Sequence, residues 1–204
     1  MKLGFTNRAA WTAFGLDSPF WSPIYVETVT DQTSLSLHPF VEPRIEPEIV
    51  IGLASELAHG AERDAVAAAI GWAAVGFEIV QCHYANWEMT PADAIADGGL
   101  HGLLVVGERH VLDAPRAAAL ANVEVELVRG EETVATGVGA DALGGPVEAV
   151  TWLLRLPGEA VPTGSIITTG TLTKAFPIAG GETWRVRTSG PGSLGDLGLL
   201  LLAQ

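Results

Sequence analysis

Cysteine, clustered positive charge and long apolar runs are all scarce in this sequence. Cys82 is the sole cysteine of 204 residues, so no disulfide can form within the chain and a reducing compartment is permitted. Lys and Arg number 11 against 24 Asp and Glu and form no basic cluster, which disfavours nucleic acid and anionic membranes as partners. The apolar runs fall short of the roughly 20 residues of a membrane span, and the first residues carry no apolar signal stretch. We therefore expect a cytoplasmic protein.

Paired histidines, internal repeats and low-complexity linkers are lacking too. None of the five histidines has the spacing typical of a zinc site. The length suits a single domain with a sizeable core. We accordingly expect residues 1–204 to form one domain.

Short strands dominate the predicted secondary structure. Helices are predicted only over Glu62–Ala74, which is rich in alanine, and over Pro146–Leu154, which follows a Gly-Gly pair. The predicted strands are rich in Val, Ile, Thr or Leu and are bounded by Gly, Pro or Asp. They are Ile45–Leu53, Leu103–Val106, Asn122–Val128, Thr133–Val138, Ser165–Thr173 and Thr183–Thr188. The turn Arg129–Glu132 joins Asn122–Val128 to Thr133–Val138, which predicts a surface hairpin.

Two glutamates stand at positions i and i+2 of a predicted strand. Pro47 separates Glu46 from Glu48 and disfavours a helix in this segment. On a strand the two side chains project from the same face about 7 Å apart, a separation that two carboxylates can close onto one cation. Taken alone, such a pair is more typical of a solvent-facing strand edge.

Glu78 is a lone acid inside the apolar stretch from Ala74 to Val80. A buried carboxylate needs a partner, and no Lys or Arg lies near it in sequence. The partner is then either a distant cation in the fold or a metal ion. Carboxylate ligands favour Mg²⁺ or Mn²⁺ over Zn²⁺.

Five passages in a fixed order carry a resemblance to a known family. They are Lys2–Arg8, Ile45–Ile49, the run from Gly76 to Asp97, Gly139–Pro146 and Gly170–Ala175. The sequence resembles the fumarylacetoacetate hydrolase superfamily, and within it the branch of 2-keto-4-pentenoate hydratases and 4-oxalocrotonate decarboxylases. The resemblance implies an α+β fold, a strand-rich mixed β-sandwich or roll with a few short helices, and a homo-oligomer.

The resemblance also implies a metal site and a substrate site. In the family, Mg²⁺ or Mn²⁺ is bound by three glutamates that correspond to Glu46, Glu48 and Glu78. The same three residues stand out by their positions in the sequence, as a pair on one strand and a lone acid in an apolar stretch. Lys2 corresponds to a family lysine beside the substrate, which implies a role in substrate binding or proton transfer; otherwise Lys2 is part of a frayed terminus.

Within the matching passages, Asp97 and Thr171 are further candidates for substrate binding. Three departures from the family pattern bear on this site. The chain begins one residue before the Lys-Leu-Gly stretch, so we expect it to lack the usual N-terminal helical region. Glu88 follows Trp87 where many hydratases have a lysine, and Gly98–His101 replaces an Asn-Ala-Ser-Ser stretch. These changes predict a different distal pocket, in which His101 is either a proton donor or a structural residue.

The resemblance implies a small 2-oxo acid as the substrate, and the carboxylate and keto oxygens of such an acid can chelate a metal ion. The leading interpretation, which rests on the family branch, is a hydratase that adds water to a 2-oxo-4-enoate or 2-hydroxy-2,4-dienoate in aromatic-compound degradation. One alternative is a decarboxylase or a carbon-carbon hydrolase of acylpyruvate-type acids. Another is a non-catalytic metal-binding subunit of a related enzyme.

Overall fold

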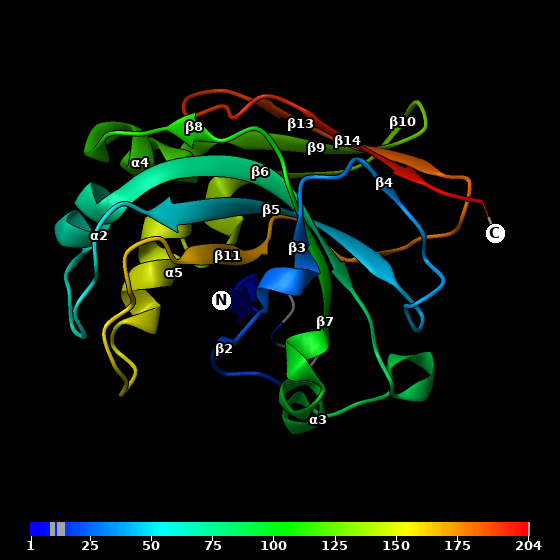
Figure 1. Cartoon of the computed structure of the whole chain (residues 1–204), viewed down its shortest axis with the longest axis horizontal. Coiled ribbons are helices and arrows are strands. Elements are labelled where there is room, and N and C mark those ends of the chain that lie inside the picture. Colours follow the sequence, from blue (N-terminus) through cyan, green and yellow to red (C-terminus); the bar gives the residue numbers. More distant parts are fainter. Residues whose placement is uncertain (9–10, 12–14, 204) are drawn as a thin grey trace.

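The computed structural model describes residues 1–8, 11 and 15–203, which form two β-sheets and several short helices (Figure 1). Within these residues the larger sheet consists of β1 (Lys2–Gly4), β2 (Phe20–Ser22), β3 (Val29–Thr30), β5 (Arg44–Leu53), β6 (Ile70–Val80), β7 (His101–Val106), β8 (His110–Val111), β11 (Ile166–Thr171) and β12 (Phe176–Pro177). Its order is β2-β1-β11-β5-β6-β7-β3, with β12 paired to β5 and β8 paired to β6. β5 and β6, the longest strands, therefore lie at its centre.

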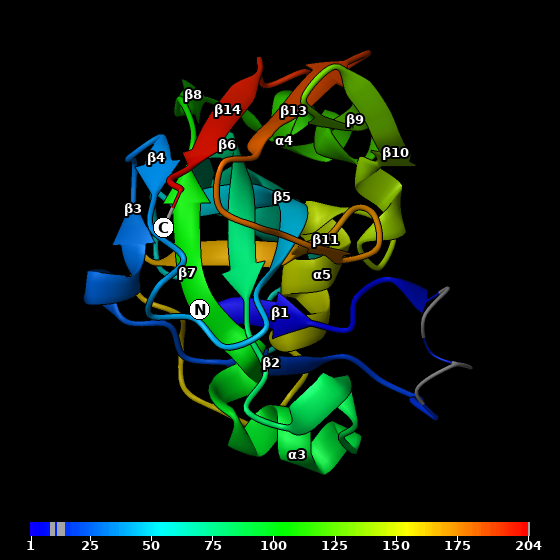
Figure 2. The ribbon, with the colours of Figure 1, turned by 90° about the vertical axis from the view of Figure 1, so that its right-hand side faces the viewer.

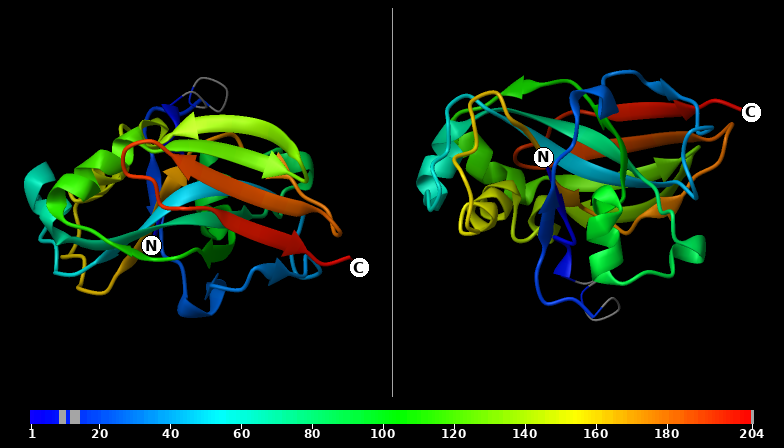
Figure 3. Two further views of the ribbon diagram at one scale, coloured as in Figure 1. Left: turned by 90° about the horizontal axis from the view of Figure 1, so that it is seen from above. Right: turned by 60° about the horizontal axis from the view of Figure 1, so that its bottom comes forward.

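The smaller sheet lies over one face of the larger one (Figure 3). It consists of β4 (Ser34–Leu35), β9 (Glu124–Arg129), β10 (Glu132–Val138), β13 (Thr183–Ser189) and β14 (Leu197–Leu201), in the order β10-β9-β13-β14-β4. Phe77 and Ile49 from the larger sheet belong to the same buried cluster as Leu127 and Trp184 from the smaller one. The hydrophobic core therefore holds the two sheets together.

Short helices lie beside the sheets. They are α2 (Arg63–Ala69), α3 (Pro91–Ala96), α4 (Ala114–Ala119) and α5 (Pro146–Leu153), with 3-10 turns η2 (Val26–Thr28), η3 (Ala85–Trp87), η4 (Gly98–Leu100), η5 (Leu120–Asn122) and η6 (Gly139–Asp141). α2, α4 and α5 contact one another at one end of the sheets, whereas α3 lies below β1 and β2 (Figure 2). Among the described residues, no helix is long and apolar enough to cross a membrane.

The predicted fold class is confirmed, since parallel pairs such as β1 with β11 occur beside antiparallel pairs such as β5 with β6. The helix from Pro146 and the hairpin with its turn at Gly130 are confirmed as well. The predicted helix Glu62–Ala74 is wrong in its second half, because α2 ends at Ala69 and β6 begins at Ile70. Pairing of β6 with β5 and β8 outweighs the helix propensity of this alanine-rich segment.

Pro47 lies in the middle of β5, a position where proline cannot donate a ladder hydrogen bond. The pairing of β5 with β11 shifts its register between Thr168 and Thr171, opposite this part of β5. At the shift the Pro47 carbonyl accepts a hydrogen bond from Leu172 N at 2.9 Å. The register shift thus accommodates the proline. It also turns the backbone N–H of Gly170 toward Glu48, and this N–H donates a hydrogen bond of 2.8 Å to Glu48 Oε2.

Candidate metal and substrate site

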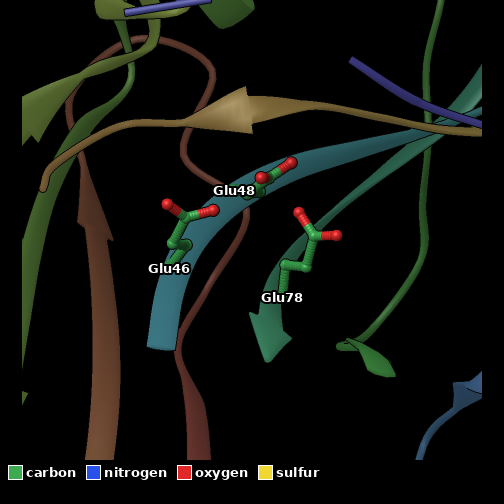
Figure 4. Close-up of side chains that lie close together, drawn as sticks. All are labelled: Glu46, Glu48 and Glu78. Atoms are coloured by element: carbon green, nitrogen blue, oxygen red, sulfur yellow. The ribbon is translucent and has the colours of Figure 1, made fainter. Parts of the chain in front are cut away.

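Three glutamates meet at the centre of the larger sheet. Glu46 and Glu48 project from the same face of β5, and Glu78 on β6 stands directly opposite Glu46. One carboxylate oxygen of each lies within 4.8 Å of the others. Figure 4 shows the three side chains close together on the two neighbouring strands. The structure thus brings together the three residues that were predicted to bind a metal.

The three carboxylates do not titrate alike. Burial and the charge of Glu78 raise the pKa of Glu46 to about 7, and burial with the two neighbouring carboxylates raises the pKa of Glu48 well above its usual value. Burial also acts to raise the pKa of Glu78, but the nearby Lys2 ammonium and the hydrogen bond from His101 outweigh it and lower this pKa to about 2. Glu78 is therefore ionised at neutral pH, and a cation is required to keep all three in the charged form.

Lys2 lies in β1, between β11 and β2, and is not part of a frayed terminus. Its Nζ lies 2.7 Å from Glu78 Oε1 and donates a hydrogen bond of 2.7 Å to the carbonyl of Gly99. Burial acts to lower the pKa of Lys2, yet the charges of Glu78, Glu46 and Glu48 raise it above its usual value. Lys2 is thus the distant cation that Glu78 requires, and it stays protonated.

His101, the first residue of β7, lies behind Glu78. Its Nδ1 is 2.8 Å from Glu78 Oε1, and its Nε2 is 2.9 Å from Thr28 Oγ1. The Thr28 hydroxyl in turn donates to the carbonyl of Tyr25 at 2.9 Å. His101 contacts Glu78 but does not line the cavity beside the three carboxylates.

A cavity of about 460 Å³ opens beside the three carboxylates. Lys2 and Thr171 line it, whereas Asp97 does not. The Asp97 carboxylate lies 2.7 Å from His83 Nδ1 and accepts a hydrogen bond from His83 N, so the structure does not bring this predicted substrate-binding residue to the cavity. Arg44 and Lys174 also line the cavity. Lys174 lies inside one of the passages that resemble the family and Arg44 lies directly before another, but no pattern in the sequence indicates that the two residues meet.

The donor set suits a hard divalent cation. It offers carboxylate oxygens alone, the ligands that Mg²⁺ and Mn²⁺ prefer. Glu78 Oε2 is buried and has no hydrogen-bond partner among the described residues, and such an unpaired acceptor is costly unless a cation binds it. By contrast, Glu48 Oε2 accepts hydrogen bonds from Gly170 N and from the Thr168 hydroxyl, which hold its carboxylate in place.

Residues 17–197 match the fumarylacetoacetate (FAA) hydrolase C-terminal family. The chain belongs to this family. Among similar members of the fumarylacetoacetate hydrolase family is the TodF product hydratase of Pseudomonas putida, 31% identical over 200 residues, which cover 95% of this chain and 73% of the relative. A 2-keto-4-pentenoate hydratase of Dechloromonas aromatica is 29% identical over 207 residues, with 96% and 76% covered.

Solved structures have the same fold as this chain. A 4-oxalocrotonate decarboxylase from Pseudomonas putida G7, complexed with magnesium and adipate, superposes with a TM-score of 0.89 at 27% identity. The superposition covers 98% of this chain and 76% of that one. A fumarylpyruvate hydrolase from Pseudomonas aeruginosa, complexed with Mn²⁺ and pyruvate, shares the fold with a TM-score of 0.75 at 14% identity.

Proposed function

We propose that the chain is a divalent-metal-dependent hydratase that adds water to a small 2-oxo-4-enoate or its 2-hydroxy-2,4-dienoate form. The observation that carries this proposal is the convergence of three carboxylates and a protonated lysine on one cavity. Several similar relatives are named as hydratases of 2-keto-4-pentenoate or of 2-hydroxyhexa-2,4-dienoate. We further propose that the chain acts as one catalytic domain of a cytoplasmic homo-oligomer.

Glu46, Glu48 and Glu78 would hold the cation. When bound, Mg²⁺ or Mn²⁺ supplies Lewis-acid polarisation of the keto oxygen and offsets the negative charge that develops there during proton transfer. Glu48 is held by its two hydrogen bonds from β11, and Glu78 is held by Lys2 and His101. These contacts fix two of the three carboxylates before substrate arrives, which lowers the cost of reorganisation.

Lys2 has a donor left for the substrate. Two of its three N–H groups point to Gly99 O and Glu78 Oε1, and its side chain lines the cavity. The third can donate to the carboxylate of a 2-oxo acid, a charge-assisted hydrogen bond that orients the acid. Leu3, Phe20 and Val80 line the same cavity and exclude water from this contact.

Decarboxylation is the second candidate, because a 4-oxalocrotonate decarboxylase complexed with magnesium is among the structures that superpose well. In this chain the reaction would use the same cation and the same lysine, Lys2. The chemistry that distinguishes it from hydration lies in the proton-transfer group and the placement of water. A non-catalytic role is less well supported, since all three carboxylates are retained in a substrate-sized cavity.

Ultraviolet absorbance of a dienoate tests this proposal. The assay follows 2-hydroxypenta-2,4-dienoate and its terminally carboxylated analogue with Mg²⁺, with Mn²⁺ and with chelator. We expect metal-dependent loss of the diene with the hydroxy-oxo acid as product, and a loss of at least about 100-fold in kcat/KM for Glu46→Gln, because changes even around metal ligands cost 10–100-fold. Glu131→Gln, in the exposed hairpin turn, is the matched control. Release of CO₂ would favour the decarboxylase, and no turnover of either acid by protein that binds Mn²⁺ would contradict both.

A further inference from the structure

Lys2 is held by a turn of the chain as well as by Glu78. The turn is η4, Gly98–Leu100, and its Gly99 carbonyl accepts a hydrogen bond of 2.7 Å from Lys2 Nζ. Gly99 and Leu100 also line the cavity beside the lysine. The direction in which Lys2 presents its remaining donor therefore depends on where this turn lies.

The backbone of the turn is strained. Gly98, Gly99 and Leu100 have φ angles of 63°, 69° and 62°, so three successive residues lie in the left-handed region. This region is costly for leucine, and residues other than glycine do not form left-handed runs of their own accord. Such strain persists only where the surrounding structure holds it in place.

Close packing fixes one side of the turn. A Cβ at Gly99 would lie 2.9 Å from the Phe20 ring and from Ser22 Cβ, and 3.3 Å from Lys2 Cδ. The backbone of Gly99 therefore rests directly on β1 and β2, where only glycine fits. This packing stops the turn from moving toward Lys2, but it does not stop the turn from moving away.

Asp97 holds the turn from the other side. It directly precedes Gly98, and its carboxylate accepts a hydrogen bond of 3.0 Å from His83 N at Oδ2, while its Oδ1 lies 2.7 Å from His83 Nδ1. The Asp97 side chain is only 14% exposed, so water competes little for these contacts. At the other end of the turn, the Leu100 carbonyl accepts from Gln81 N at 2.9 Å. Both ends are thus fastened to the segment that follows β6.

We propose that Asp97 is a positioning residue for Lys2. Its two contacts with His83 keep the turn Gly98–Leu100 against Lys2, so that the Gly99 carbonyl takes one donor of the lysine and another stays directed at the substrate. This inference rests on the proposed function for the contact between Lys2 and the 2-oxo acid. Without the Asp97 carboxylate the strained turn relaxes, and Lys2 keeps Glu78 as a partner but loses its fixed direction.

Binding of a saturated 2-oxo acid tests this inference without turnover. Calorimetric titration measures the affinity of the Mn²⁺-loaded protein for 2-oxopentanoate, with Asp97→Ala introduced into the parent and into Lys2→Met. We expect Asp97→Ala to weaken binding about tenfold in the parent and to have no further effect in Lys2→Met, because the residue through which Asp97 acts is then absent. A role confined to stability of the fold predicts the same factor in both backgrounds.

Three further variants sharpen the comparison. Asp97→Asn should retain most of the affinity, because its amide can accept from His83 N and donate to His83 Nδ1. His83→Ala removes the Nδ1 contact at an exposed position, so it should cause a smaller loss with the same dependence on Lys2. The control Asp113→Ala removes a carboxylate that accepts from Arg116 N at the start of α4, and it should leave the affinity unchanged.

Equal weakening by Asp97→Ala in both backgrounds would overturn the inference, as would an unchanged affinity in the parent background. A loss in Asp113→Ala as large as that in Asp97→Ala would also overturn it, since a general loss of charge or stability would then be the cause. If Asp97→Ala does not fold, His83→Ala decides by the same criterion. If no dienoate is hydrated, the proposed function fails, while the binding comparison still decides whether Asp97 acts through Lys2.

Discussion

Glu78 has the most demanding environment of the three glutamates. Its Oε1 lies within 2.8 Å of both Lys2 Nζ and His101 Nδ1, while its Oε2 is buried without a partner among the described residues. One oxygen thus fixes the carboxylate in the protein, and the other is left for a ligand. A like-charged residue, Glu46, stands directly opposite on β5, a pairing that is destabilising unless a cation neutralises it.

Replacement of Lys2 should separate catalysis from metal binding. In Lys2→Met the substrate loses a charged donor, so we expect kcat/KM to fall by about 100-fold or more. Affinity for Mn²⁺ should be retained or increase, because a positive charge beside the three carboxylates has been removed. Steady-state kinetics and calorimetric titration of Mn²⁺ measure the two effects. Activity close to that of the parent would show that Lys2 does not contact the substrate.

At the scale of elements, the irregular end of β11 links the fold to the site. Gly170 has a φ of 102°, and its N–H is the donor to Glu48. A Cβ at this position would lie 1.7 Å from Thr6 Oγ1, so no side chain fits. The backbone of β11, rather than a side chain, thus sets the direction of a predicted metal ligand.

Gly170→Ala should therefore lower both stability and metal affinity. Strain at a positive φ together with the clash against Thr6 should cost at least about 2 kcal/mol of unfolding free energy, measured by urea denaturation. Gly164→Ala is the matched control, because Gly164 has a φ of 81° but nothing within 4 Å of an added Cβ. A loss no greater than that of the control would show that the close approach of β11 to Thr6 is not required.

The elements also show how far sequence alone reaches. The alternation of Val125 and Leu127 with Glu124 and Glu126 predicts β9 correctly, because it is a local pattern, and these residues are buried and exposed accordingly. The i, i+2 spacing of Glu46 and Glu48 likewise needs only one strand. The pairing of Glu46 with Glu78, and of β12 with β5, depends on contacts between distant segments. For that reason the sequence did not indicate that Lys174 joins Arg44.

At the scale of the whole molecule, the carboxylates of the site couple stability to pH. The pKa of Glu46 is raised to about 7 in the folded state, and the pKa of Glu48 is raised as well. In an unfolded chain the pKa of a glutamate is about 4.5, so below this pH both residues contribute fully to the stability of the fold. This contribution is lost as pH rises through 7. The pKa of Glu78 is lowered to about 2, so its contribution is present above pH 4.5 and is lost only below that.

The metal-free protein should therefore become less stable between about pH 5 and pH 8, as thermal denaturation in chelator measures. Divalent cation should reverse the trend, because it binds the ionised carboxylates, and at 100 times its Kd it stabilises by about 2.7 kcal/mol. Glu46→Gln should flatten the metal-free profile, whereas Glu131→Gln should not. If the thermal stability of the metal-free protein instead rose between about pH 5 and pH 8, the raised pKa values of Glu46 and Glu48 would be contradicted.

The measurement that tests the central claim most directly is a calorimetric titration of Mn²⁺ into the parent protein and into Glu46→Gln, Glu48→Gln, Glu78→Gln and Glu131→Gln. A single cation shared by the three glutamates predicts one ion per chain, an affinity reduced at least about tenfold in each of the first three variants, and an unchanged affinity in the fourth. Equal affinity in all five proteins, or no binding by the parent, would contradict it.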